Sequence, residues 1–170
     1  LSIYLDTLKT MDSTQMGNYL GLESLLNTSD SAKNSIASAL VEQVHKCLDY
    51  QITSCDIQSY NAIVTAEVTT FDSASILSDY QNSRDAYLSS VDAVIDGSSK
   101  RYEHSLELLL DSINNNTSTI TSSVTFHLFN DGVSWKLLEN SEALGNAIFG
   151  TLSTTPVPDD PDSSGEGEDA

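Results

Sequence analysis

The stretch that decides the fold runs from residue 62 to residue 71 and reads AIVTAEVTTF. It is rich in β-branched residues, which are enriched in strands. Ala62, Val64, Ala66 and Val68 recur at every second position, so a strand places all four on one face. The pattern predicts a strand whose apolar face packs against helices.

The residues before this strand predict a second strand and then helices. Leu48, Tyr50 and Ile52 alternate with polar residues, and a polar turn is expected around Asp56. Two short strands joined by a polar stretch favour an antiparallel pair. Further upstream, the apolar period becomes that of a helix. Its stripe consists of Ile36, Leu40, Val44 and either Cys47 or Leu48.

Two shorter helices are expected at the start of the chain. The first has apolar residues at near-helical spacing, namely Ile3, Leu5, Leu8 and Met11. The second is capped by Asp12 or Ser13 and stops at Gly21, because glycine commonly ends a helix.

The stretch after residue 71 predicts a helical hairpin. Asp72 or Ser73 is placed to cap a long helix, which is expected to run to a stop at Gly97. A second helix follows and ends in the three asparagines at 114–116.

The last part of the apolar pattern returns to strands. Alternating residues over 124–128 and 133–138 flank Asn130-Asp131-Gly132, and Asp-Gly tolerates the positive φ angles of a tight hairpin turn. If the ring of Trp135 is in the core, Trp135→Ala is expected to destabilise the domain by ~3–5 kcal/mol. A short closing helix is predicted from Glu142 to Phe149.

Together these elements predict one α+β domain over residues 1–150. The N-terminal helices and the helical hairpin are expected on one face of a mainly antiparallel sheet of about four strands. Residues 151–170 form a tail with all three prolines and six of the acidic residues. Such a segment cannot bury enough apolar surface to offset its chain entropy, so this acidic tail is predicted to be disordered.

The charge of the chain excludes several classes of partner. There are 25 Asp and Glu against 7 Lys and Arg, so the formal charge is 7 − 25 = −18. This balance argues against nucleic-acid binding, which needs bases to displace counterions, and against electrostatic docking to anionic lipid. No apolar run approaches the roughly 18 residues of a membrane span, so no transmembrane helix is expected in this chain.

No motif predicts a catalytic, cofactor-binding or metal-binding residue. There is no nucleophile elbow and no glycine-rich phosphate loop, and His45, His104 and His127 lack metal-ligand spacing. His127 is expected to be an exposed or half-exposed strand residue. Cys47 and Cys55 are the only cysteines; they are candidates for a loop-closing disulfide, with two reduced thiols as the alternative.

Acidic residues near tyrosines are the candidates for general acid–base chemistry. Asp49, Glu67 and Asp72 lie on or next to the predicted strands, with Tyr50 and Tyr60 close in sequence. The alternation of its strand indicates that Glu67 points outward into solvent. No catalytic role is assigned to any of them.

Three stretches resemble domains of the nuclear transport factor two-like, or cystatin-like, fold. They are SIYLDTLKTMDSTQMGNYL at 2–20, YNAIVTAEVTTFD at 60–72 and NDGVSWKLLENSEALGNAIFG at 130–150. The resemblance implies a curved sheet wrapped over helices with a cone-shaped cavity. Many such domains of Gram-positive gut bacteria are lipoproteins held outside the cell, without an assigned activity.

The leading hypothesis is therefore an extracytoplasmic bacterial domain, lipid-anchored upstream or secreted, that binds a small ligand or a protein without catalysis. One alternative is a small isomerase or dehydratase with a buried carboxylate in a cone-shaped pocket. A second alternative is a self-associating structural module, a homodimer joined through the helical hairpin. A cavity containing an Asp or Glu beside a tyrosine would favour the enzyme.

Overall fold

The computed structural model describes residues 1–12, 15, 31–138 and 142–149. In chain order, its elements are α1 (Ser2–Thr10), α4 (Ser31–Cys47), β1 (Asp49–Gln58), β2 (Asn61–Phe71), α5 (Ser73–Leu88), α6 (Val91–Ile95), α7 (Ser98–Asn114), β3 (Thr119–Asn130), β4 (Trp135–Leu137) and α8 (Glu142–Phe149). The α+β prediction is confirmed. Asp12 caps the expected second short helix as predicted, because its Oδ1 accepts a hydrogen bond from the N–H of Gln15 at 2.8 Å. The rest of that helix and the acidic tail lie outside the described residues.

The strands form one antiparallel sheet in the order β1-β2-β3-β4. Strand β2 is paired along its whole length with β3, from Asn61 opposite Phe129 to Phe71 opposite Thr119. A register shift between Ile52 and Ser54 interrupts the pairing of β1 with β2, so the edge strand carries a bulge.

The turn between β1 and β2 lies later than the sequence predicts. It consists of Ser59 and Tyr60, because Gln58 still pairs with Asn61. Ser59 has a φ of 55°, and positive φ is what a two-residue hairpin turn requires. The turn expected at Asp56 is therefore wrong, and this polar residue is part of a longer strand.

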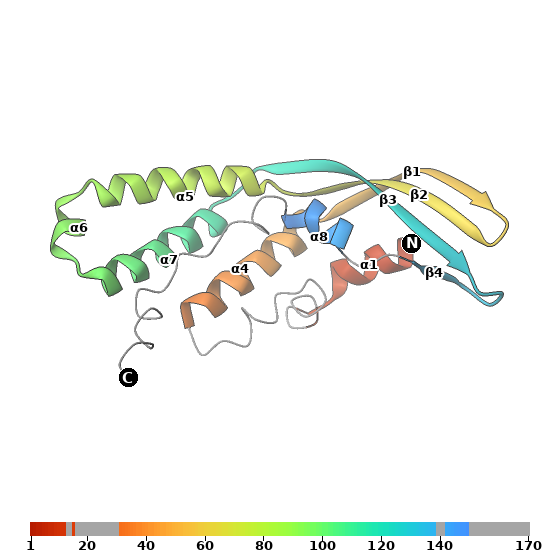
Figure 1. Cartoon of the computed structure of the whole chain (residues 1–170), viewed down its shortest axis with the longest axis horizontal. Coiled ribbons are helices and arrows are strands. Elements are labelled where there is room, and N and C mark those ends of the chain that lie inside the picture. The colour runs from red at the N-terminus through yellow and green to blue at the C-terminus, as the bar shows by residue number, and fades with distance from the viewer. Residues whose placement is uncertain (13–14, 16–30, 139–141, 150–170) are drawn as a thin grey trace, which may run out of the picture.

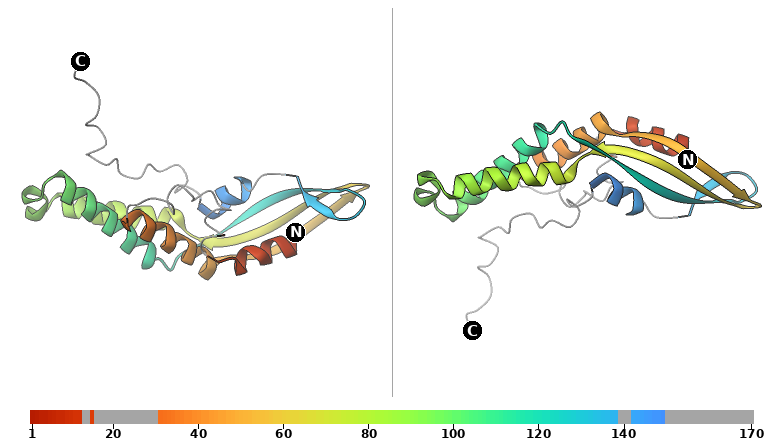
Figure 2. Two further views of the ribbon diagram at one scale, coloured as in Figure 1. Left: turned by 90° about the horizontal axis from the view of Figure 1, so that it is seen from below. Right: turned by 90° about the horizontal axis from the view of Figure 1, so that it is seen from above.

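The molecule is elongated (Figure 1). Helices α5, α6 and α7 extend away from one end of the sheet, while the hairpin turns of the strands lie at the other end. In the views from above and below, α1 and α4 lie along the β1 side of the sheet and α8 along the β3 side (Figure 2).

The core lies between the helices and one face of the sheet. The predicted inner stripe of β2 is buried, as are the residues paired with it on β3, namely Val124, Phe126 and Leu128. Helices α4 and α8 pack on β2. The predicted stripe of α4 is buried at Ile36, Leu40 and Val44, and so are Leu5 and Leu8 of α1.

One residue of the expected α1 stripe does not join the core. Ile3 is 84% exposed, whereas Leu5 and Leu8 are buried. Positions 5 and 8 are three apart and share one side of a helix, but position 3 is two residues from position 5 and faces another direction.

The helical hairpin packs chiefly on α4. The buried amide of Gln43 joins the two parts, because its Nε2 donates a hydrogen bond to the carbonyl oxygen of Ile113 at 2.8 Å. Asp72 caps α5 as predicted and accepts hydrogen bonds from the N–H groups of Ala74 and Ser75.

The long helix predicted up to Gly97 is broken. Helix α5 ends at Leu88, and α6 begins after Ser90, whose Oγ accepts a hydrogen bond from the N–H of Ala93 at 3.3 Å. Serine competes for backbone hydrogen bonds and favours caps over helix interiors. The pair Ser89-Ser90 therefore supplies a break that the apolar stripe alone does not reveal.

The Asp-Gly turn between β3 and β4 is wider than predicted. Asn130 pairs with Trp135, so the loop has four residues, and only Gly132 among them has a positive φ, of 93°. Asp131 holds the loop by accepting hydrogen bonds from the N–H groups of Val133 and Ser134.

Trp135 lies near this loop, at the free end of the sheet. Its residue surface is 39% exposed, so the expectation of a core ring is wrong. Strand β4 pairs only with the last three residues of β3, which leaves the indole at the rim rather than over the buried centre.

Candidate functional site

A groove between α4 and α7 is a concave surface lined by described residues. Its volume is about 560 Å³, within the range of small-molecule sites. Its lining is mainly polar and consists of Ser31, Asn34, Ser35, Ser38, Ala39, Glu42, Leu110 and Asn114.

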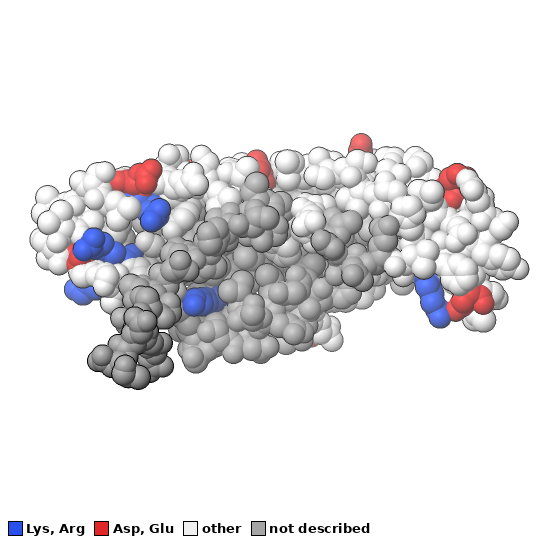
Figure 3. Space-filling view, in the orientation of Figure 1, with Lys and Arg blue, Asp and Glu red and all other residues white. Residues whose placement is uncertain are grey.

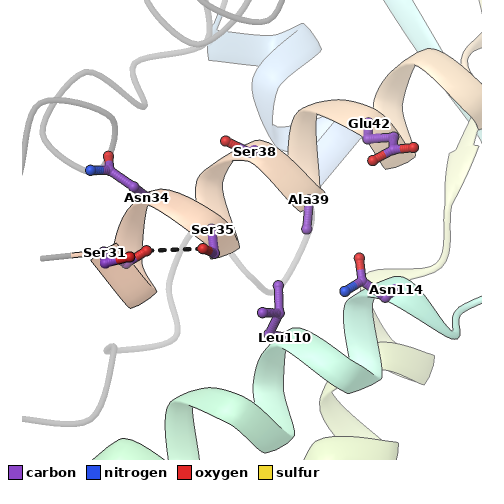
Figure 4. Close-up of a pocket in the computed structure, with 8 residues that line it drawn as sticks. All are labelled: Ser31, Asn34, Ser35, Ser38, Ala39, Glu42, Leu110 and Asn114. Carbon is purple, nitrogen blue, oxygen red and sulfur yellow. Dashed lines mark hydrogen bonds between the residues drawn. The ribbon is translucent and has the colours of Figure 1, made fainter.

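The groove follows from the two faces of α4. The apolar stripe of the helix is directed into the core, so the residues on its other side stay outside. Ser31, Ser35, Ser38 and Glu42 are spaced by four, three and four residues, which places them on one face. Figure 4 shows this polar row on α4, with Leu110 and Asn114 on α7 across from it.

The groove has an apolar floor and a polar rim. Ala39 and Leu110 point toward one another between the two helices (Figure 4). The hydroxyl of Ser35 donates a hydrogen bond to the carbonyl oxygen of Ser31 at 2.9 Å. By contrast, the side chains of Ser38, Glu42 and Asn114 have no hydrogen-bond partner within the described part of the chain.

These three groups determine what the groove would bind. A carboxylate accepts hydrogen bonds and attracts a cation, while an amide and a hydroxyl both donate and accept. The arrangement suits a small molecule with an apolar body and an amino or hydroxyl group. Sequence reasoning missed this site because the apolar stripe alone predicts the helix. The sequence does contain one signal for this site, the row of polar residues at helical spacing on the face of α4 opposite its apolar stripe.

The two cysteines carry free thiols in this structure. Cys47 is half-buried at the end of α4, and its thiol lies 3.8 Å from Oε1 of Gln43. Cys55 is exposed on β1. Strand geometry places residue 55 about 20 Å from the start of β1, and a disulfide needs Cα atoms within about 7 Å. A bridge between them stays a prediction, and it would require β1 to leave the sheet.

The acid and tyrosine candidates near the start of β1 interact with different partners. Asp49 is ion-paired with Lys9 at 2.6 Å, and the hydrogen bond from Lys9 lowers the pKa of Asp49. Tyr50 instead donates to Asp6 at 2.8 Å, and this hydrogen bond raises the pKa of Tyr50. Both pairs are exposed, so neither forms the buried acid–tyrosine site that an isomerase would need.

The remaining candidates are also on the surface or in structural roles. Glu67 is exposed on the outer face of β2, as predicted, and Tyr60 is exposed in its turn. His127 is half-buried, on the face of β3 opposite Phe126, which confirms its prediction. The buried residues of the described ranges include no Asp or Glu, and no group of three metal-ligating side chains occurs in these ranges.

The fold is that of an open, antiparallel sheet with helices on one face and a helical hairpin inserted between its two central strands. The structure is similar to one solved structure, described as "a putative lipoprotein (ycdA)" from Bacillus subtilis, with a TM-score of 0.54 and 19% sequence identity. The similarity covers 80% of this chain, and the chain spans 44% of the length of that protein. At this identity, the likeness concerns the fold.

No family model matches the chain, and no curated protein matches its sequence. None of the described helices is long and apolar enough to cross a membrane.

Proposed function

We propose that this chain is an extracytoplasmic binding domain of a lipoprotein-type protein, without catalytic activity, and that the groove between α4 and α7 is its ligand site. The observation that carries the proposal is a set of three polar groups at the groove, Ser38, Glu42 and Asn114, which have no hydrogen-bond partner among the described residues and lie beside an apolar floor. The compartment is inferred from the likeness to the B. subtilis lipoprotein.

The ligand class follows from the one carboxylate at the groove. Glu42 is exposed and lies on a helix whose other groove residues are uncharged. An amine would place its cation at Glu42 and its hydrogen bonds on Asn114 or Ser38. An exposed ion pair contributes about 0.2–1 kcal/mol, which favours an amine over the corresponding alcohol.

The proposal can be tested with hexylamine and hexan-1-ol as probes, followed by backbone amide shifts in nuclear magnetic resonance. We expect hexylamine to shift the amides around Ser38, Glu42 and Asn114 and to bind up to about fivefold more tightly than hexan-1-ol. Glu42→Gln should abolish this difference. Glu103→Gln, an exposed acid on α7 outside the groove, is the matched control and should keep it.

Two results would contradict the proposal. Shifts confined to other surfaces would move the site away from the groove. An equal response of Glu42→Gln and the unsubstituted chain would show that the carboxylate takes no part in binding.

The isomerase alternative receives no support from the described residues, since none of their carboxylates is buried beside a tyrosine. Self-association through the helical hairpin remains the other alternative. It predicts a mass that rises with concentration in analytical ultracentrifugation.

A further inference from the structure

The far end of the helical hairpin exposes a cluster of aliphatic side chains. Val91, Val94 and Ile95 are 74%, 81% and 76% exposed, and Leu88 at the end of α5 is 42% exposed. The spacing of the three α6 residues places them on one face, while Ala93 is buried against the hairpin. We name Leu88, Val91, Val94 and Ile95 the apolar tip.

The apolar tip is part of an ordered arrangement rather than a loose loop. The hydroxyl of Tyr87 donates a hydrogen bond to Oδ2 of Asp96 at 2.9 Å, across α6. Arg101 donates from Nε to the carbonyl oxygen of Asp96 at 3.0 Å. The ring of Tyr87 also packs on His104, with centroids 4.3 Å apart. These contacts hold α6 in place while its aliphatic side chains face outward.

Basic residues lie directly behind the apolar tip. Arg84 is one helical turn before the end of α5, and Lys100 and Arg101 are in the first turn of α7. All three are exposed, and Figure 3 shows basic side chains gathered at this end of the molecule. Arg84 precedes Leu88 by four residues, which is about 6 Å along α5 at 1.5 Å per residue.

This end carries no net charge, although the whole chain is strongly acidic. Residues 84–101 contain three bases and three acids, a balance of 3 − 3 = 0 in a chain of −18. The acids are Asp85, Asp92 and Asp96. The overall charge opposes docking to anionic lipid, but the neutral balance of residues 84–101 adds nothing to that opposition.

The exposed area is too small for a stable pairing of two copies. Four such side chains offer on the order of 400 Å² of surface, the size of the largest patch on an ordinary monomer. A stable interface buries about 800 Å² on each partner. A bilayer has no such threshold, since each aliphatic group gains from entering the acyl region by itself.

We propose that the apolar tip docks on a lipid bilayer that contains anionic lipid. Val91, Val94 and Ile95 enter the acyl boundary, and Arg84, Lys100 and Arg101 meet the phosphates at headgroup depth. The site is separate from the groove and does not depend on the proposed ligand binding.

The test is co-sedimentation of the full chain with vesicles of phosphatidylglycerol and phosphatidylcholine, compared with vesicles of phosphatidylcholine alone. We expect binding to the mixed vesicles. The triple variant Val91→Ser, Val94→Ser, Ile95→Ser should lower that binding at least about tenfold. The matched control Ile3→Ser, Val133→Ser, Leu138→Ser changes three exposed aliphatic residues elsewhere and should bind normally.

A second pair of variants tests the charge. Lys100→Gln should weaken binding to the mixed vesicles about fivefold and leave binding to phosphatidylcholine unchanged. Lys46→Gln, which removes an exposed base on α4, is the control. The proposal is overturned if the unsubstituted chain does not bind mixed vesicles. It is overturned too if the triple variant binds them as tightly as the unsubstituted chain does. It is also overturned if ultracentrifugation shows a dimer that the triple variant dissociates, because the occupant is then a second copy.

Discussion

The inner face of β2 and the outer face of α6 carry the same kind of side chain in opposite surroundings. Val64 and Val68 of β2 are buried beneath helices, while Val91 and Val94 of α6 are 74% and 81% exposed. Helices pack on the valines of β2. Helix α6 lies beyond the end of α4, and no described element covers its outer face (Figure 1). An apolar pattern therefore indicates that a face needs a partner, but it does not say whether the chain itself provides one.

The largest expected effect tests the buried side of this comparison. Phe71 at the end of β2 is 0% exposed and packs edge-on against Phe149 of α8, with ring centroids 6.1 Å apart. Phe71→Ala should lower the free energy of unfolding by about 3–5 kcal/mol in urea denaturation. Trp135→Ala, at the rim of the sheet, should cost only about 1 kcal/mol. Equal losses would contradict the placement of Trp135.

A matched pair of valines compares the two regions directly. Val68→Ala removes two buried methyl groups and should destabilise the chain by about 2 kcal/mol. Val94→Ala removes the same atoms from an exposed site and should change stability by less than about 0.5 kcal/mol. Denaturation midpoints measured side by side check both. A large loss for Val94→Ala would mean that the apolar tip is covered in solution.

The junction between the two regions can be weakened at the cap of α5. Asp72 accepts hydrogen bonds from Ala74 N–H at 3.0 Å and Ser75 N–H at 3.3 Å, just where β2 gives way to the hairpin. Asp72→Ala should cost about 1 kcal/mol in thermal or urea unfolding. Asp79→Ala, an exposed acid later in the same helix, should change stability little. Equal effects would show that the cap adds nothing beyond the lost charge.

The smallest effect concerns an exposed ion pair in the β3–β4 loop. The hydrogen bond from Lys136 is the main cause that lowers the pKa of Asp131 from 3.8 to about 2, with help from the N–H groups of Ser134 and Val133. Because this pKa lies below its ordinary value, the loop is fully stabilised above about pH 4 and loses that stabilisation as the pH falls through 2. Carbon-detected titration of Asp131 should show the low midpoint, and Lys136→Gln should raise it. An unchanged midpoint would exclude Lys136 as the cause.

The regular elements of the fold could be predicted because their apolar periods match their surroundings. The inner stripe of β2, the stripe of α4 at Ile36, Leu40 and Val44, and the closing helix α8 all follow from local pattern. The cap at Asp72 followed from residue type alone. In each case a short-range preference and the tertiary contact agree.

The errors arose where a local preference had several solutions. A polar residue such as Asp56 is compatible with either a turn or an exposed strand position. Because Gln58 still pairs with Asn61, Asp56 lies within the strand. Trp135 fits a core or a rim, and the short β4 left it at the rim. The groove could not be predicted, because it depends on the contact between α7 and α4. The spacing of residues within one helix does not reveal which other helix packs beside it.

The two ends of the helical insertion have a further consequence. Phe71 and Thr119 are directly paired across β2 and β3, so the chain leaves the sheet and returns to it at the same place. The insertion can then be lengthened or shortened by whole turns without changing how the strands pair. Helix α5, with 16 residues, spans about 24 Å. If the apolar tip docks as proposed, the length of the hairpin sets the distance between the sheet and the docking surface.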